Sequence, residues 1–403
     1  MPSRRFAAVT PAPPDPILGL TEAFKADPRP GKINLSVGVY RDEAGRTPVL
    51  DSVREAERRL LEAEATKAYK PITGDPQLAD AVQRVVLGPD HTLAEEGRVV
   101  AAHTPGGTGG LRVVGDFLAQ NTLGVTLWRS DPTWANHPAV FEAAGVKTRT
   151  YAYYDPATRG LDFDAMIEDL REVGEGDVVL LHGCCHNPTG VDPTLEQWAA
   201  IADLLADRGA LPLIDFAYQG FGAGIDEDAA GVRLLAERLP ELIVVASFSK
   251  NFGLYQDRAG AAIFVTENAE QSEAVASRVK IAIRRNYSNP PAHGGEVVKT
   301  ILLDEALRSQ WVDEVAAMRG RIHKVRGQLK EGLDARGVSL SAEGNDFLPR
   351  QSGMFSYTGL TKAQVDQLRD DHAVYVVGSG RINVAGITPD NLEPLCLAIA
   401  EVV

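Results

Sequence analysis

Four short apolar runs decide the fold class of this 403-residue chain: Val178-Val-Leu-Leu181, Leu211-Pro-Leu-Ile214, Leu242-Ile-Val-Val-Ala246 and Ala261-Ala-Ile-Phe-Val265. Helical patterns lie between several of these runs, such as the one from Leu195 to Asp207. Runs of this length without polar alternation are typical of strands buried on both faces, and intervening helices favour parallel pairing. The segment therefore predicts an α/β fold with a mostly parallel sheet covered by helices.

The chain after Pro291 has a different pattern. A long helical pattern extends from about Gly294 to Gly337, short strands are expected near 354–357 and 381–384, and a final helix begins near Pro389. We interpret this part as a second, smaller α/β domain. We expect residues 41–314 to form the large domain. Residues 315–403 would form the small domain together with residues 1–40, which include an extended arm at Thr10 to Pro16.

The charge balance limits the classes of partner. Lys and Arg total 41, whereas Asp and Glu total 55, which gives a net charge of -14. Such a chain has no general electrostatic attraction to nucleic acid or to an anionic membrane. We therefore expect neither partner, and any anionic ligand needs a local binding site.

Cysteine content and the distribution of apolar residues favour the cytoplasm. The three cysteines include the neighbours Cys184 and Cys185, which cannot easily form an unstrained disulfide with each other. The N-terminal stretch MPSRRFAAVTPAPPDP lacks an apolar run of signal-peptide length, and no apolar stretch reaches the roughly 18 residues of a membrane span. We expect a cytoplasmic protein, and a short organelle-targeting segment stays an open alternative.

Polar residues that follow the apolar runs are the candidates for chemistry, because ligands of open α/β sheets gather beyond the carboxyl ends of strands. Lys250 follows one run and can form an imine with a carbonyl cofactor. Asp215 follows another and is costly to bury unless it pairs with a cation, such as a protonated pyridine nitrogen. Taken singly, Lys250 could be a surface lysine and Asp215 a helix cap.

A glycine cluster supplies a candidate phosphate site. The segment His103-Thr-Pro-Gly-Gly-Thr-Gly-Gly-Leu-Arg112 precedes a helical pattern from Leu111 to Ala119. Glycines allow backbone N–H groups to approach an anion, and a helix N-terminus attracts negative charge. The fingerprint G-x-G-x-x-G does not fit, because a frame from Gly107 reaches Arg112 at its third glycine. A nicotinamide enzyme is therefore disfavoured, and a glycine-rich helix start without a ligand is the simpler alternative.

Nine segments in order resemble the aspartate and aromatic aminotransferases of the class I, fold-type I group, from one end of the chain nearly to the other. The resemblance implies the fold of that group, with a seven-stranded type of sheet in the large domain and a smaller α/β domain. The segments are Asp15-Pro-Ile-Leu-Gly19, Asn34-Leu-Ser-Val-Gly-Val-Tyr40, Gly106-Gly-Thr-Gly109, Asp131-Pro-Thr-Trp-Ala-Asn-His137, Cys185-His-Asn-Pro-Thr-Gly190, Asp215-Phe-Ala-Tyr-Gln-Gly220, Ser247-Phe-Ser-Lys250, Asn286-Tyr-Ser-Asn-Pro-Pro291 and Ser379-Gly-Arg-Ile-Asn-Val-Ala385.

The resemblance implies pyridoxal 5'-phosphate as the cofactor and three catalytic residues. Lys250 would be the Schiff-base lysine and the general base and acid of the proton shift. Asp215 would keep the pyridine nitrogen protonated, and Tyr218 would lie beside the phenolic oxygen together with Asn187. The other implied cofactor-binding positions are Gly107, Thr108, Ser247 and Arg258 at the phosphate, Trp134 over the ring, and Tyr69 from a neighbouring subunit.

The resemblance also implies how amino acid and 2-oxo acid substrates bind. Arg381 would clamp the α-carboxylate with help from the backbone of Gly38, since a planar guanidinium forms two parallel bonds with such a group. Trp134 and Asn187 would also contact the substrate. Arg284 of the second subunit of a homodimer would bind the distal carboxylate, and its neighbour Arg285 competes for this role.

The expected reaction moves an amino group from aspartate or glutamate to 2-oxoglutarate or oxaloacetate in ping-pong steps. Aromatic specificity is the nearest alternative, and dual specificity stays open. Ser36 and the segments 247–250 and 284–287 resemble aromatic-preferring members. Positions that favour aspartate are Val39, Arg41, Thr47, Thr108 and Asn289.

Other classes of function fit the sequence less well. A ligand-sensing regulator would need a DNA-reading module, and no basic helix-turn-helix segment is present. β-Decarboxylation or elimination on the same cofactor is a further alternative. No metal site is expected, because His182 and His186 flank a loop-forming Cys-Cys pair instead of lying on one helix face.

Overall fold

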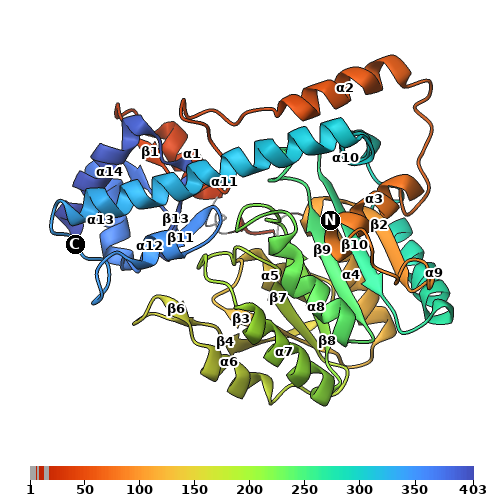
Figure 1. Ribbon diagram of the computed structural model, residues 1–403. Coiled ribbons are helices and arrows are strands. Elements are labelled where there is room, and N and C mark those ends of the chain that lie inside the picture. Colours follow the sequence, from red (N-terminus) through yellow and green to blue (C-terminus); the bar gives the residue numbers. More distant parts are fainter. Residues whose placement is uncertain (1–5, 7–8, 13–17) are drawn as a thin grey trace, which may run out of the picture.

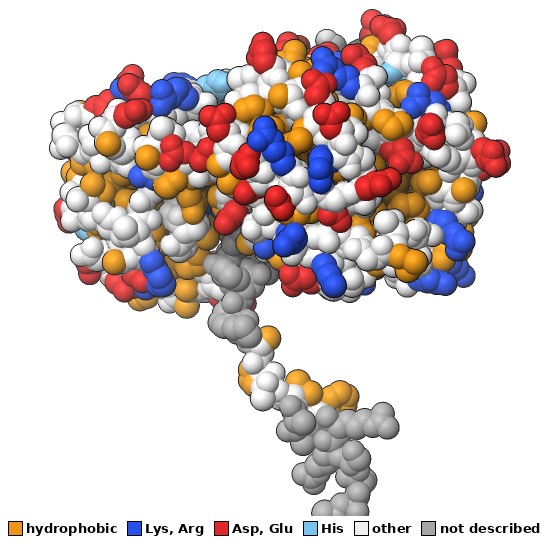
Figure 2. All heavy atoms as spheres, turned by 90° about the horizontal axis from the view of Figure 1, so that it is seen from below, with side chains coloured by type: hydrophobic (Ala, Val, Ile, Leu, Met, Phe, Trp, Pro, Cys, Tyr) orange, Lys and Arg blue, Asp and Glu red, His pale blue; other side chains and the backbone are white. Residues whose placement is uncertain are grey.

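The computed structural model describes Phe6, residues 9–12 and residues 18–403. It contains a large α/β body and a smaller body, with one long helix, α11 (Glu305–Asp334), extending across both (Figure 1). The described part of the N-terminal arm extends away from the folded body (Figure 2), and Phe6 is 88 % exposed. Positions 13–17 of the predicted arm and of the segment that begins at Asp15 lie outside the described residues.

A seven-stranded sheet forms the centre of the large body. The strand order is β2-β10-β9-β8-β7-β3-β4, and every neighbouring pair is parallel except the two pairs that include β10. The prediction of a mostly parallel sheet is thus confirmed, and the four apolar runs are β7 to β10. The bounds are β2 Val99–Pro105, β3 Thr126–Asp131, β4 Lys147–Ala152, β7 Val178–His182, β8 Leu211–Phe216, β9 Leu242–Ser247 and β10 Ala259–Val265.

Both faces of this sheet are buried, because apolar side chains alternate between two hydrophobic cores. Val179 and Ile214 belong to one core, with Trp198 of an overlying helix, whereas Leu180 and Leu213 belong to the other. The helices of the first core include α6 (Phe163–Leu170), α7 (Leu195–Arg208) and α8 (Ala230–Arg238); those of the second are α4 (Gly106–Asn121), α5 (Asn136–Ala143) and α9 (Ala269–Asn286). Strands with apolar side chains on both faces therefore lie in the centre of the sheet, where helices cover both faces.

The smaller body has its own core and two short sheets. β1 (Ile33–Asn34) pairs in parallel with β12 (Val374–Tyr375), and β11 (Phe355–Tyr357) pairs antiparallel with β13 (Arg381–Asn383). The strands expected near 354–357 and 381–384 and the final helix are thus present. The helices here are α1 (Leu18–Ala26), α12 (Phe347–Arg350), α13 (Lys362–His372) and α14 (Pro389–Val402).

The remaining elements connect or cover these two bodies. Elements of the large body are α2 (Asp51–Ala63), α3 (Pro76–Leu87), the hairpin strands β5 (Tyr154–Asp155) and β6 (Gly160–Leu161), and a single turn at Glu227–Ala229. Another single turn, Val384–Gly386, follows β13.

The single helical pattern predicted from Gly294 to Gly337 is wrong in one respect, because two helices occupy it. α10 (Ala292–Leu303) ends at Asp304, whose side chain accepts the backbone N–H of Leu307 at 2.9 Å and so caps the start of α11. The predicted domain boundary at 314/315 falls inside α11. Ile322 still belongs to a core of the large body and Val325 to the core of the small body, so the division at 314 stays a prediction.

Surface and helix properties bear on the expected partners. On the face that Figure 2 shows, Lys and Arg side chains are scattered among Asp and Glu side chains. None of the helices within residues 18–403 combines the length and apolar character needed to cross a membrane.

Trp311 of α11 fixes this helix on the large body and provides a test of the fold. Its ring is fully buried and stacks on Phe252 at 4.4 Å between centroids, and its indole N–H donates to the carbonyl of Asn251 at 2.8 Å. Trp311→Ala should lower the free energy of unfolding by about 3 to 5 kcal/mol, because it leaves a cavity and an unpaired carbonyl. Chemical denaturation measures this loss. Leu123→Ala, at a fully exposed side chain, is the control, and an equal effect of both changes would contradict the assignment.

Candidate active site

The site lies at one edge of the seven-stranded sheet, where several strands end. β7, β8 and β9 are parallel, so His182, Asp215 and Ser247 lie at the same edge. β10 runs in the opposite direction, so its first residues lie at this edge, and Ala259 pairs with Pro105 at the end of β2. The chain therefore brings Arg258, just before β10, to the N-terminus of α4.

Arg258 and the start of α4 form an anion-binding cup. Gly106 has φ +68°, and a Cβ there would lie 2.5 Å from Nη2 of Arg258, so only glycine allows the guanidinium to approach the helix. Arg258 also donates to the Ser249 hydroxyl at 3.1 Å. The prediction that the helix begins at Leu111 was wrong: α4 begins at Gly106, so the glycines form its first turn instead of a preceding loop. Their free N–H groups suit a phosphate.

A cavity of about 240 Å³ extends from this cup. It brings together most of the residues that the sequence predicted, from eight separate parts of the chain. Its lining residues are Gly38, Gly107, Thr108, Leu111, Trp134, Asn187, Asp215, Ala217, Tyr218, Ser247, Ser249, Lys250, Tyr255, Arg258, Phe355 and Arg381.

Lys250 presents a reactive amine to the cavity. Burial lowers its pKa to about 8; the charge of Asp215 opposes the shift and that of Arg258 reinforces it. The Nζ atom lies 4.8 Å from the centroid of the Tyr218 ring. About half of the amines are therefore neutral at pH 8, which is the form that attacks an aldehyde.

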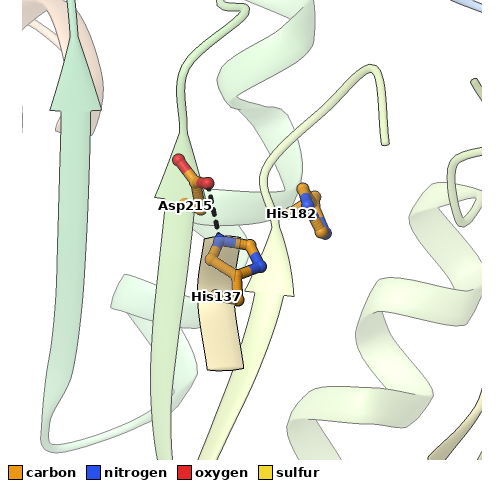
Figure 3. A group of neighbouring side chains, drawn as sticks. All are labelled: His137, His182 and Asp215. Carbon is orange, nitrogen blue, oxygen red and sulfur yellow. Dashed lines mark hydrogen bonds and ion pairs between the residues drawn. The ribbon is translucent and has the colours of Figure 1, made fainter. Parts of the chain in front are cut away.

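Asp215 is held as a carboxylate by a buried histidine (Figure 3). His137, which is fully buried, lies with Nε2 2.9 Å from Oδ2 of Asp215 and Nδ1 2.8 Å from the Thr133 hydroxyl. The Thr133 hydroxyl can donate to Nδ1, which leaves the proton on Nε2 for Asp215. Burial alone would raise the pKa of Asp215, but the hydrogen bond from His137, together with the electrostatic influence of the two histidines and Lys250, outweighs burial, and the pKa lies below its ordinary value. An anion is thus available for a protonated ring nitrogen.

Two further histidines adjoin this pair and are neutral at pH 7. Burial, with a contribution from His137, lowers the pKa of His182 to about 3, and burial also lowers the pKa of His186. His186 stacks on Tyr153 at 3.9 Å between centroids. His137, His182 and Asp215 lie close enough to hold a metal ion, but the contacts of His137 to Asp215 and Thr133 already occupy both of its ring nitrogens. These two hydrogen bonds account for the position of His137 beside Asp215.

Arg381 forms the opposite wall of the cavity. It donates to the Ser36 carbonyl at 2.6 Å and to Oδ1 of Asn187 at 3.2 Å, and its guanidinium carbon lies 4.3 Å from the centroid of the Phe355 ring. Its Nε–H is buried and unpaired among the described residues. At Gly38 a Cβ would lie 2.8 Å from the Phe355 ring, so glycine is required there. A buried guanidinium with an unused donor suits a carboxylate ligand.

Tyr69 and Arg284 do not line the cavity of their own subunit. Tyr69 is 92 % exposed, and Arg284 is exposed and contacts Ser288. They belong to one surface region, because Asn289, close to Arg284, donates to the carbonyl of Lys70 at 2.7 Å. Arg285 instead donates to Gln120 of α4 at 2.9 Å, so the two neighbouring arginines have different partners.

The donor set fits pyridoxal 5'-phosphate. The Arg258 and α4 cup can hold the phosphate, Asp215 the ring nitrogen, and Lys250 the aldehyde carbon. The two glycines support this assignment, because a Cβ at Gly106 would collide with Arg258 and one at Gly107 would lie 3.1 Å from the Cβ of Ser247.

Comparison with known proteins identifies the family. The model of aminotransferase classes I and II matches residues 30–399. The chain belongs to this aminotransferase family. It is 53 % identical over 397 residues to the aspartate aminotransferase of Escherichia coli K12, a match that covers 98 % of this chain and 100 % of that protein.

Other relatives include aromatic-specific aminotransferases. The aromatic-amino-acid aminotransferase of Pseudomonas aeruginosa is 50 % identical over 397 residues, with 98 % of each chain covered. The structure of the aromatic-amino-acid aminotransferase of Burkholderia pseudomallei, covalently bound to pyridoxal phosphate, matches with a TM-score of 0.96 and 46 % identity, covering 99 % of this chain and 100 % of that one. The predictions of the family, the fold type, a transaminase and pyridoxal phosphate as its cofactor are confirmed.

Sequence reasoning did not single out several residues of this aminotransferase site. Phe355 and Tyr255 line the cavity, and His137 forms the hydrogen bond to Asp215. Phe355 lies in a short strand with no polar signal in the sequence. The His137 role could have been inferred, since a histidine beside a predicted ring-covering tryptophan can reach the end of a neighbouring strand.

The lowered pKa of Lys250 predicts an unusual pH dependence of its reactivity. In the cofactor-free protein, acylation of Lys250 should follow the fraction of neutral amine and reach half its maximum near pH 8, whereas ordinary lysines do so near pH 10.4. Brief labelling at a series of pH values with mass spectrometry of the peptides measures this. A midpoint above pH 10 would contradict the burial of the amine.

Proposed function

We propose that this aminotransferase moves the amino group of L-aspartate or L-glutamate to 2-oxoglutarate or oxaloacetate. The observation that carries the proposal is the presence of the Lys250 amine in one cavity with the Asp215 carboxylate and the Arg381 guanidinium. This arrangement supplies a base for the substrate Cα, an anion for the cofactor ring and a cation for the α-carboxylate. The Escherichia coli relative bears the name of aspartate aminotransferase, which supports the same choice.

The protein's own groups orient the reactants and move one proton. Bound pyridoxal phosphate supplies an electron sink for the electrons released at Cα. Lys250 Nζ would take up the proton of the substrate Cα and later release it, so one amine would serve as base and then as acid. Asp215 would hold the ring nitrogen of the bound cofactor in its protonated form, and the hydrogen bond from His137 favours the ionised form of Asp215.

The remaining side chains fix the position of the cofactor and the substrate. Asn187 and Tyr218 would hydrogen-bond the phenolic oxygen of the cofactor, and Trp134 would cover its ring. Gly107, Thr108, Ser247 and Arg258 would bind the phosphate, as their place around the cup suggests. Arg381 would bind the substrate α-carboxylate in two parallel hydrogen bonds.

Two exposed residues bear on the subunit arrangement. We propose a homodimer in which Tyr69 reaches the phosphate and Arg284 the distal carboxylate of the neighbouring site. Their exposure, and the contact that joins their two segments, support a common role outside their own cavity. We further propose that the enzyme is cytoplasmic, as its reduced cysteines suggest.

Aromatic amino acids are the second candidate substrates. Trp134, Tyr218 and Phe355 give the cavity an aromatic lining, and two of the matched relatives are named for aromatic amino acids. A pocket of this kind discriminates among apolar side chains by only about 1 to 3 kcal/mol per group, so dual activity is compatible with the proposal.

Single-turnover absorbance spectra test the choice of substrate. The holoenzyme is mixed separately with L-aspartate and L-phenylalanine, and the oxo acids are identified. The cofactor band should convert to its amino form at least about tenfold faster with aspartate, because a cation is available for each carboxylate. Faster conversion with phenylalanine would assign the enzyme to the aromatic branch. A Lys250→Ala variant, which lacks the proton-transfer amine, should not turn over with either amino acid.

Hybrid dimers test the shared site. Lys250→Ala and Arg284→Ala should each abolish or strongly reduce turnover of aspartate. A purified hybrid of one Lys250→Ala and one Arg284→Ala subunit should regain about half of the wild-type activity per dimer, because one of its two sites then has both native residues. No recovery in the hybrid would show that Arg284 acts within its own subunit. Arg285→Ala in the same hybrid design is the matched control for the competing arginine.

A further inference from the structure

Arg326 of α11 is a fully buried arginine close to the site but absent from the cavity lining. Its guanidinium donates to the carbonyls of Leu348 at 3.0 Å and Gly353 at 2.8 Å. It also donates to the Phe355 carbonyl at 2.5 Å, with longer contacts to Ser352 and Ser356. One side chain therefore binds four backbone oxygens of a single loop, residues 348–356.

This cation is buried without a direct carboxylate partner. None of the ion pairs within residues 18–403 includes Arg326; burial lowers its pKa to about 10, and the nearby Cys185 and Asp192 oppose that shift. The side chain thus stays charged at pH 7. The dipoles of the backbone carbonyls compensate the buried charge of Arg326. Without Arg326, these carbonyls would be buried and unpaired.

The loop that Arg326 holds joins the cofactor segment to the substrate arginine. At its start, Ser352 N–H donates to the carbonyl of Gly190 at 2.6 Å, and a Cβ at Gly353 would lie 2.4 Å from the Cβ of Cys185. The loop therefore fits closely against the segment 185–190, which carries Asn187.

At its end the loop becomes β11, which pairs with the strand of Arg381. Tyr357 lies opposite Arg381 in this pair. Phe355 lies beneath the Arg381 guanidinium, against Gly38, and edge-on to Tyr218 at 6.0 Å between centroids. A shift of the loop would therefore move the surface on which Arg381 rests.

We propose that Arg326 is a positioning residue for the α-carboxylate site, which it acts on through the loop 348–356 and Phe355. It sets the place of Arg381 relative to Asn187 without touching the substrate or the cofactor. The inference rests on the proposed binding of a substrate carboxylate by Arg381. A purely structural arginine would support stability alone, whereas this role predicts a specific loss of carboxylate affinity.

The test measures binding of succinate, which is aspartate without its amino group, to the holoenzyme. Arg326→Met should raise the dissociation constant of succinate and the KM for aspartate by on the order of tenfold to a hundredfold, because small displacements of a clamp are costly. Arg326→Lys, which keeps the charge but has fewer donors, should give a smaller rise. The cofactor absorbance should be retained in both variants, since none of the proposed phosphate ligands is moved.

Arg336→Met is the matched control. Arg336 follows the C-terminus of the same helix, bonds the carbonyl of Gly332 at 2.6 Å and pairs with Glu393, far along the chain from the loop. This variant should lose stability without a change in succinate affinity. If Arg326→Met and Arg326→Lys lower the melting temperature but leave the dissociation constant and KM at wild-type values, the proposal is overturned.

Phe355→Leu keeps the proposal testable if Arg326→Met does not fold. It should weaken succinate binding, and its effect should combine non-additively with that of Arg326→Lys, because both act on the same support of Arg381. Additive effects, or none, would refute transmission through Phe355. Failure of the wild-type holoenzyme to bind succinate would instead contradict the proposed function itself, which separates the two inferences.

Discussion

The reversal of the chain between β9 and β10 is the constraint on which the site depends. Lys250 follows β9 and Arg258 precedes β10. If these two strands were parallel, Lys250 and Arg258 would lie at opposite edges of the sheet. Because β10 is antiparallel to both of its neighbours, β9 ends and β10 begins at the same edge of the sheet, which is also the edge where α4 begins. Lys250, Arg258 and the glycines of α4 then surround one cavity, and every other ligand position is arranged around them.

Local electrostatics oppose the overall charge of the protein. The chain carries a net charge of -14, yet its cavity collects two guanidinium groups and an amine. Burial keeps His182 neutral and lowers the pKa of Lys250. Desolvation thus limits the positive charge at the site. Asp215, stabilised by His137, provides the one carboxylate of the cavity lining. The positive charges that attract an anionic ligand are thus concentrated in the cavity.

Much of this arrangement was predictable from sequence, and the exceptions have physical causes. Strands β7 to β10 and the positions of Asp215 and Lys250 followed from continuous apolar runs that end in polar residues. The helix start at Gly106 could not be predicted in this way, because glycine has poor helix propensity. Glycine is required at this position by the close approach of Arg258. The break at Asp304 was missed because a capping aspartate looks like any charged position inside a helix.

Tertiary contacts account for the residues that sequence could not assign. Phe355 and Arg326 have ordinary sequence surroundings, and only the folded loop shows that one supports Arg381 and the other gathers carbonyls. The exposure of Tyr69 and Arg284 is likewise visible only in the structure. The resemblance to the family implies their roles, and their place on a common surface region agrees with the proposal of a site shared between subunits.

The pairing of β1 with β12 has a consequence for biosynthesis. Ile33 lies opposite Val374, so β1 finds its partner strand only after all the strands of the large sheet have been synthesised. The large sheet needs nothing beyond β10 and can assemble earlier, since domains generally fold as units during synthesis. Gly38 and Arg381 therefore meet only after this sheet has been made, and a chain that stalls between β10 and β13 contains the proposed phosphate site but not the proposed carboxylate site.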